Sequence, residues 1–95
     1  MKIISNRRLR EFSERFPEAD MPLQAWRKVM EKSEFPHWGA LKAVFPHADK
    51  VGDKVVFNIG GNKFRIAAGI SFAAQILWIK AVMTHAEYDK GAWKT

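Results

Sequence analysis

The 95-residue sequence contains no cysteine, which excludes disulfide bonds and thiolate chemistry. No stretch approaches the ~20 apolar residues of a membrane span, so no membrane partner is expected. The apolar run at residues 1–5 is too short for a signal peptide. Together these absences predict a cytoplasmic protein.

Several signatures of catalytic and cofactor sites are also missing. His37, His47 and His85 lie far apart in the sequence and form no metal-ligand spacing with nearby carboxylates. There is no His-Glu-x-x-His motif, no glycine-rich phosphate-binding loop and no serine in a nucleophile elbow. The sequence therefore predicts no metal and no cofactor, so any chemistry must come from side chains alone.

Positive charge, by contrast, is in excess. Lys and Arg number 16 and Asp and Glu number 10, which gives a formal net charge of +6 and an isoelectric point of about 9.9. A small domain this basic is often a nucleic-acid binder or the partner of an acidic protein, although a lysine-rich surface alone gives the same composition. The length allows one domain, residues 1–95, and 7 Phe and 4 Trp predict an aromatic-rich core.

The first half of the chain has a β-prone start followed by a helical period. A helix is predicted over residues 7–16, with Ser5 or Asn6 as its cap. Asp20 is predicted to cap a second helix. A third, shorter helix is predicted within residues 36–46, which are bounded by prolines. The first two helices, joined by a few residues, are expected to form a hairpin laid on a sheet.

The second half of the chain changes to a period of two. Residues 47–53 are polar and predict a loop, after which Val55, Phe57 and Ile59 form one apolar face of a strand. A Gly-Gly-Asn turn then supplies the positive φ that a tight hairpin needs, and a second strand follows. A third strand, residues 75–83, is apolar on both faces, as a central strand would be.

The order β-α-α-α-β-β-β predicts an α+β fold, with a small antiparallel or mixed sheet and N-terminal helices packed on one face. The opposite face is predicted to be open, basic and polar. By strand parity it carries Asn58, Lys63 and Arg65, and Lys80 of the third strand is expected to share it. Residues 85–90 are predicted to leave the sheet as a last helical turn.

Arg65, His85 and Tyr88 are the candidate catalytic residues. An Arg in mid-strand can bind a phosphate through two hydrogen bonds, or it can pair with a carboxylate and extend to water. His85 suits proton transfer near neutral pH, and Tyr88 lies three residues further on. The alternative for these two is a helix-capping His and a half-buried Tyr. The predicted RNA-binding residues are Lys63, Lys80 and Asn58.

One reaction suits Arg, Lys, His and Tyr without a metal, namely the cleavage of RNA by its own 2′-hydroxyl. A base takes the hydroxyl proton, the oxygen attacks the neighbouring phosphorus, cations stabilise the phosphate oxygens, and an acid protonates the leaving oxygen. The expected products carry a 2′,3′-cyclic phosphate and a 5′-hydroxyl.

The chain resembles the HigB-type toxins of bacterial toxin–antitoxin pairs, in the RelE-like superfamily. The resemblance rests on Val-Phe-Asn-Ile-Gly-Gly-Asn-Lys-Phe-Arg-Ile at residues 56–66 and on Val-Met-Thr-His-Ala-Glu-Tyr-Asp-Lys at residues 82–90. The Leu-Lys-Ala-Val-Phe-Pro of residues 41–46 and the opening Ile-Ile-Ser fit as well. The likeness covers nearly the whole sequence.

This resemblance implies a RelE-like fold and an endoribonuclease that cleaves mRNA, often on the ribosome. It also implies a cognate antitoxin, commonly with a helix-turn-helix DNA-binding domain. Arg65 matches the Arg after the Gly-Gly-Asn turn, and His85 and Tyr88 match the Thr-His-x-x-Tyr segment, which supports a functional role for all three. Two alternatives remain, a non-catalytic RNA-binding module and a basic interaction domain for an acidic partner.

Overall fold

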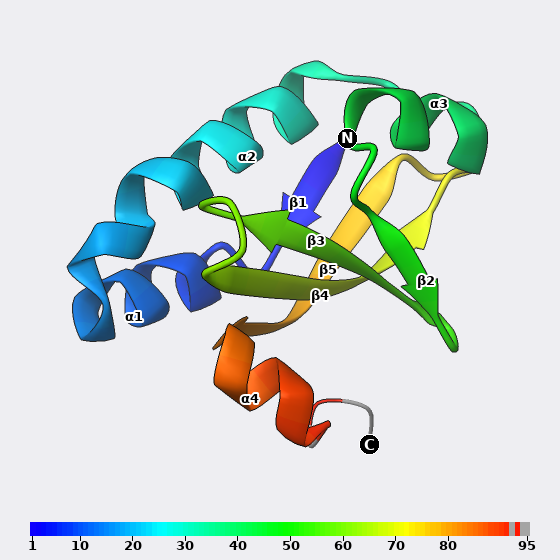
Figure 1. The fold of residues 1–95 in the computed structure, drawn as a ribbon. Coiled ribbons are helices and arrows are strands. Elements are labelled where there is room, and N and C mark those ends of the chain that lie inside the picture. The colour runs from blue at the N-terminus through cyan, green and yellow to red at the C-terminus, as the bar shows by residue number, and fades with distance from the viewer. Residues whose placement is uncertain (92, 94–95) are drawn as a thin grey trace.

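The structure, a computed structural model, describes residues 1–91 and 93. Its elements are β1 (Lys2–Ile4), α1 (Arg7–Arg15), the 3₁₀ turn η1 (Pro17–Ala19), α2 (Asp20–Lys32), α3 (Trp38–Val44), β2 (Asp49–Val51), β3 (Lys54–Ile59), β4 (Phe64–Ser71), β5 (Ile76–Thr84) and α4 (His85–Lys90). The strands form one sheet in the order β1-β5-β4-β3-β2, in which β1 runs parallel to β5 and the other pairs are antiparallel (Figure 1). The predicted α+β class is confirmed. No helix in the described ranges is long and apolar enough to cross a membrane.

The helices α1, α2 and α3 form where the hydrophobic period predicts them, but their caps differ from the prediction. Asn6 precedes α1, yet its side chain makes no capping hydrogen bond. Asp20 is the first residue of α2 and not its cap, because η1 runs directly into α2 and Ala19 already has helical φ and ψ of −80° and −18°. A capping side chain works best from an extended backbone. His37, before α3, has one, and its Nδ1 accepts a hydrogen bond from the Ala40 amide at 3.2 Å.

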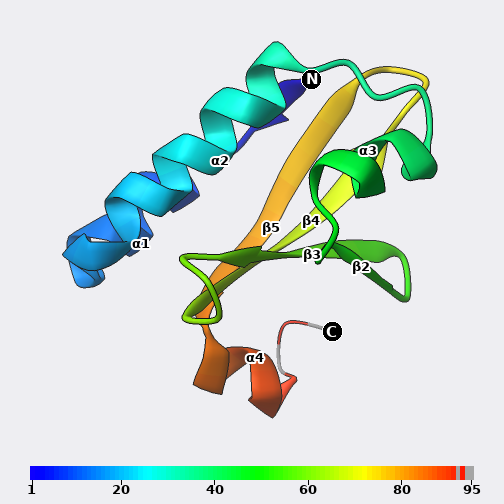
Figure 2. The ribbon, with the colours of Figure 1, turned by 45° about the horizontal axis from the view of Figure 1, so that its top comes forward.

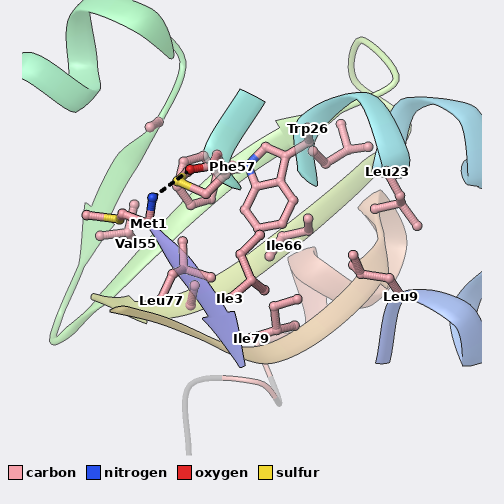
Figure 3. Packing of buried hydrophobic residues seen from close by; sticks show 14 of the residues in the cluster. Met1, Ile3, Leu9, Leu23, Trp26, Val55, Phe57, Ile66, Leu77 and Ile79 are labelled. Carbon is pink, nitrogen blue, oxygen red and sulfur yellow. Dashed lines mark hydrogen bonds between the residues drawn. The ribbon is translucent and has the colours of Figure 1, made fainter. Parts of the chain in front are cut away.

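The main core lies between the sheet and the three N-terminal helices. Val55, Phe57 and Ile59, predicted to share the core face of their strand, are all buried. The Phe57 ring is centred 5.3 Å from that of Trp26 in α2 and 5.4 Å from that of Phe45 just after α3. Figure 3 shows Trp26 lying over the side chains of the sheet. Aromatic contacts thus join two helical segments to the same strand.

The prediction of a loop over residues 47–53 is wrong, because this segment contains β2. Lys50 lies opposite Val55 in the antiparallel ladder, and a Gly-Asp turn with a φ of 63° at Gly52 connects β2 to β3. β2 is one of the two edge strands and is largely exposed. An exposed edge strand needs few apolar side chains, so its polar sequence looked like a loop.

The hairpin between β3 and β4 has the predicted turn and parity. Gly60 and Gly61 have φ values of 60° and 70°, a region that favours glycine. The register places Arg65 directly opposite Asn58, on the face away from α1, α2 and α3. The hairpin therefore brings these two polar residues together at one end of the sheet.

The predicted third strand is β5, which is paired on both sides, but it carries a β-bulge that the sequence did not predict. Ala67 pairs with Ala81, whereas Ala68 pairs with Ile79, so Lys80 is an extra residue in the ladder. A bulge shifts the alternation of side chains by one residue. Both halves of β5 can therefore face the main core despite their different parity.

The prediction of an open, basic and polar second face is wrong for half of that face. Val56, Ala67 and Met83 are buried there in a second, smaller cluster, against which Tyr88 and Trp93 pack. α4 lies on the opposite side of the sheet from α2 and α3 (Figures 1 and 2). The apolar side chains in this part of the face are covered by Tyr88 of α4 and by Trp93.

Candidate active site

The candidate site lies where the hairpin loop after β3 meets the start of α4. The His85 amide donates to the Lys63 carbonyl at 3.0 Å, which ties the helix to the loop. Thr84 forms a capping box with Glu87. The Thr84 Oγ1 accepts from the Glu87 amide at 3.2 Å, and the Thr84 amide donates to Glu87 Oε1 at 2.9 Å. These bonds fix where α4 begins and hence where its side chains lie.

Arg65 and Tyr88 are brought into contact. The Arg65 guanidinium carbon lies 5.4 Å from the centre of the Tyr88 ring, within the range of a cation–π interaction. Arg65 is only 6% exposed. Its Nη1 donates to the carbonyls of Asn62 at 3.2 Å and Phe64 at 3.0 Å, and its Nη2 donates to Asn62 Oδ1 at 2.7 Å.

The alternative reading of Arg65, a carboxylate pair that extends to water, is wrong. Among residues 1–91 and 93, no Asp or Glu forms a salt bridge with it. Its partners are neutral oxygen atoms and an aromatic ring. No carboxylate among the described residues therefore neutralises this positive charge, which is almost fully buried.

His85 is paired with Asp89, one helical turn further along α4. The His85 Nδ1 lies 3.0 Å from Asp89 Oδ2, and the His85 side chain is 45% exposed. An Nδ1–H that donates to the carboxylate leaves Nε2 as the nitrogen available to a substrate. The alternative of a capping His is wrong, because Thr84 is the cap of α4. The other half of that alternative is correct, since Tyr88 is half-buried.

The predicted RNA-binding residues are divided by the structure. Asn58 and Lys63 are exposed beside the site, one opposite Arg65 and the other in the hairpin loop. Lys80 lies on the same face but beside Gly69 and not beside Arg65. A Cβ placed on Gly69 would be 3.5 Å from Lys80 Cε. Gly69 is four residues from Arg65 along β4, which corresponds to about 13 Å.

Three further residues contribute to the site and were not predicted. Asn62 accepts two of the Arg65 hydrogen bonds, and Asp89 holds His85. The Trp93 ring stacks on Tyr88 with centres 5.1 Å apart, and its Nε1 donates to the Tyr88 carbonyl at 3.0 Å. The spacing of His and Asp at i and i+4 on a helix was a signal for Asp89. Asn62 was marked only as the last residue of the Gly-Gly-Asn turn, and nothing local in the sequence marks Trp93.

The described side chains do not form a metal site, since no three His, Asp or Glu residues in this part of the chain lie close enough together to hold a metal ion. The guanidinium of Arg65 and the ring of Tyr88 are in contact, His85 precedes Tyr88 by three residues on α4, and the exposed Lys63 lies in the adjoining loop. Such a set can transfer protons and stabilise a developing negative charge.

Comparisons with known proteins agree on one family. The model of the HigB toxin, the RelE-like toxic component of a toxin–antitoxin system, matches residues 10–91. The mRNA interferase toxin HigB of Escherichia coli strain K12 is 40% identical over 92 residues, covering 94% of this chain and 88% of that protein. The mRNA interferase HigB of Shigella flexneri gives the same values. The mRNA interferase HigB of Escherichia coli O6:H1 is 31% identical over 93 residues, covering 95% of this chain and 90% of that protein.

Proposed function

We propose that this chain, which belongs to the HigB family of RelE-like toxins, cleaves mRNA and so inhibits translation until an antitoxin neutralises it. The relatives named as mRNA interferases match nearly the full length of the chain, which supports the same activity here. The net charge of +6 suits a polyanionic substrate.

In this proposal Arg65, His85 and Tyr88 carry out the reaction without a metal. The 2′-hydroxyl loses its proton to a base, O2′ bonds to phosphorus, the bond from phosphorus to O5′ breaks, and an acid protonates O5′. His85 performs one proton transfer, and Tyr88 performs the other or orients the RNA. Arg65 stabilises the negative charge on the phosphate oxygens. The products carry a 2′,3′-cyclic phosphate and a 5′-hydroxyl.

The observation that carries the proposal is the contact between Arg65 and Tyr88. Tyr88 lies on α4, the helix that also bears His85. A guanidinium has five N–H groups, and the described residues use three of those of Arg65. The remaining donors suit a phosphate, and the free Nε2 of His85 suits a proton transfer. In this proposal Asn58 and Lys63, which are both exposed, bind the RNA.

We further propose that cleavage occurs in the cytoplasm, on mRNA engaged by the ribosome. The partner that blocks it is a cognate antitoxin with a helix-turn-helix DNA-binding domain. Membership of a toxin–antitoxin family supports the existence of such a partner. A ribosome-bound substrate predicts that cleavage of an mRNA requires its translation.

The test compares the parent with His85→Ala and Arg65→Ala, using growth after brief induction and primer extension on cellular mRNA. We expect both variants to relieve growth arrest and to lower cleavage by about 100-fold or more, because general acid–base catalysis contributes about 10²- to 10⁴-fold. The control is Lys32→Ala, which removes an exposed cation at the end of α2. Circular dichroism checks that each variant folds.

Two results would contradict the proposal. If both variants arrest growth as strongly as the parent, the catalytic roles are wrong. If the purified parent cleaves no RNA, with or without ribosomes, the enzymatic function itself is wrong. The chemistry is checked by cleavage in the presence of EDTA and by labelling the products at their expected 5′-hydroxyl ends.

A further inference from the structure

In the described part of the chain, Tyr88 and Trp93 pack on one region of the face opposite α1, α2 and α3, around Val56, Ala67 and Met83. The same face has a second region, beside β1. Ile4, Ile76 and Trp78 are half-exposed there. Within the described part of the chain, these three apolar side chains belong to neither buried cluster and are not packed against one. Large apolar groups left in this way often mark a binding surface.

The strand register places these side chains on one face. β1 runs parallel to β5, with Ile4 beside Trp78 and Lys2 beside Ile76. Trp78 also pairs with Gly69 of β4. A Cβ on Gly69 would lie 4.0 Å from Trp78 Cε3 and 3.5 Å from Lys80 Cε, so the indole and the lysine stem lie side by side over this glycine.

The rim of this surface is basic. Lys2 and Lys80 are exposed, and neither forms a salt bridge with an Asp or Glu among residues 1–91 and 93. Two unpaired ammonium groups therefore flank an aromatic ring and two aliphatic side chains. We call this surface the β1–β5 patch; its members are Lys2, Ile4, Ile76, Trp78 and Lys80.

We propose that the β1–β5 patch binds single-stranded RNA on one side of the cleaved phosphate, with a nucleobase stacked on Trp78 and the backbone beside Lys80. The proposal rests on the function proposed above, in which RNA is the substrate. Aromatic rings that stack bases, together with cations that follow the backbone, are the general chemistry of single-strand binding. Unpaired lysines favour a polyanion over an uncharged protein surface.

The patch lies further along the sheet from the candidate active site. Trp78 pairs with Gly69 of β4, which is four residues from Arg65 along that strand, a distance of about 13 Å at ~3.3 Å per residue. A stacked strand rises about 3.4 Å per nucleotide, so about four nucleotides separate the phosphate bound by Arg65 from the base stacked on Trp78. The patch would therefore contact RNA that the catalytic residues do not touch.

The experiment measures binding of a fluorescein-labelled 20-nucleotide single-stranded RNA by anisotropy, with full-length protein carrying His85→Ala so that the RNA stays intact. In this background we expect Trp78→Ala to raise Kd about five-fold or more. Trp78→Phe, which keeps a ring, should restore most of the affinity. The control is Met21→Ala, an exposed apolar residue on α2.

The salt dependence of Kd provides an independent measurement. Lys80→Ala should reduce the slope of log Kd against log salt by about 0.7, the value for one phosphate contact on a single strand. This arm decides the question if Trp78→Ala fails to fold by circular dichroism. An unchanged Kd for a folded Trp78→Ala, or an unchanged slope for Lys80→Ala, would overturn the proposal.

Two outcomes separate this proposal from the proposed function. If the parent cleaves no mRNA but the patch variants still weaken RNA binding, the enzymatic function fails and the patch remains an RNA site. If RNA binding is unchanged while Trp78→Ala weakens the complex with the antitoxin, the patch binds an acidic protein and the proposal is wrong.

Discussion

At the scale of the residue, each candidate catalytic group is held by a neighbour that does not itself need to touch the RNA. Asn62 accepts from Arg65 through both its carbonyl and its side chain, and Asp89 pairs with His85. Such supports fix the orientation of a reactive side chain, and that orientation governs the rate when the reacting atoms must be aligned. We therefore regard Asn62 and Asp89 as positioning residues.

We predict that Asp89→Asn lowers the rate of RNA cleavage about tenfold, less than His85→Ala does. The amide keeps the size of the side chain but loses the charge that holds the imidazole, and the exposure of the pair limits the effect. The control is Asp53→Asn, an exposed Asp in the turn between β2 and β3.

A double-mutant cycle tests whether Asp89 acts through His85. If it does, Asp89→Asn should cause no further loss of cleavage in a protein that already carries His85→Ala. An additional tenfold loss in the double variant would show that Asp89 works independently of the imidazole.

At the scale of the element, the stability of α4 depends on the hydrogen bonds at its N-terminus. It has only six residues, too few for a helix that is stable by itself in water. The capping box of Thr84 and the bond between His85 and Lys63 hold it in place. These hydrogen bonds therefore help to position His85 and Tyr88, and Tyr88 is held in addition by its packing against the second cluster.

We predict that Thr84→Ala lowers the free energy of unfolding by about 1 kcal/mol, as expected for the loss of a cap. Cleavage should fall further than this value alone explains, because α4 carries two of the candidate catalytic groups. Thr84→Ser keeps the hydroxyl and should retain most of both properties. Thermal melts and cleavage assays measure the two effects. Full activity in a destabilised Thr84→Ala protein would contradict the dependence of the site on this cap.

An element could be predicted from the sequence when it is determined by residues that are close together in the chain. The helices and the Gly60-Gly61 turn were predictable, because hydrophobic period and positive φ are local properties. β2 and the bulge at Lys80 were not, because each is defined by its pairing with another strand. The same distinction applies to the site. Tyr88 was predictable as a chemical group in a motif, whereas its stack with Trp93 exists only after the chain has folded.

At the scale of the whole molecule, the main core depends on a few aromatic contacts. Phe57 is 1% exposed and packs against rings from α2 and from the segment after α3. We predict that Phe57→Ala lowers the free energy of unfolding by about 3–5 kcal/mol, a large part of the ~5–15 kcal/mol typical of a domain. Thermal melting should show a fall of at least about 12 °C. Phe57→Leu is the control and should lose much less, while a melting temperature within a few degrees of the parent for Phe57→Ala would contradict this account of the core.

The parallel pairing of β1 with β5 also affects when the protein can fold during its synthesis. Lys2 meets Ile76, so the strand translated first has no place in the sheet until the strand translated last among the five has been made. Contacts so distant in sequence form slowly, because a long segment must close before they are gained. The helix that bears the imidazole and the phenol follows immediately after that late strand. The sheet that supports the candidate site can therefore close only after the ribosome has synthesised β5.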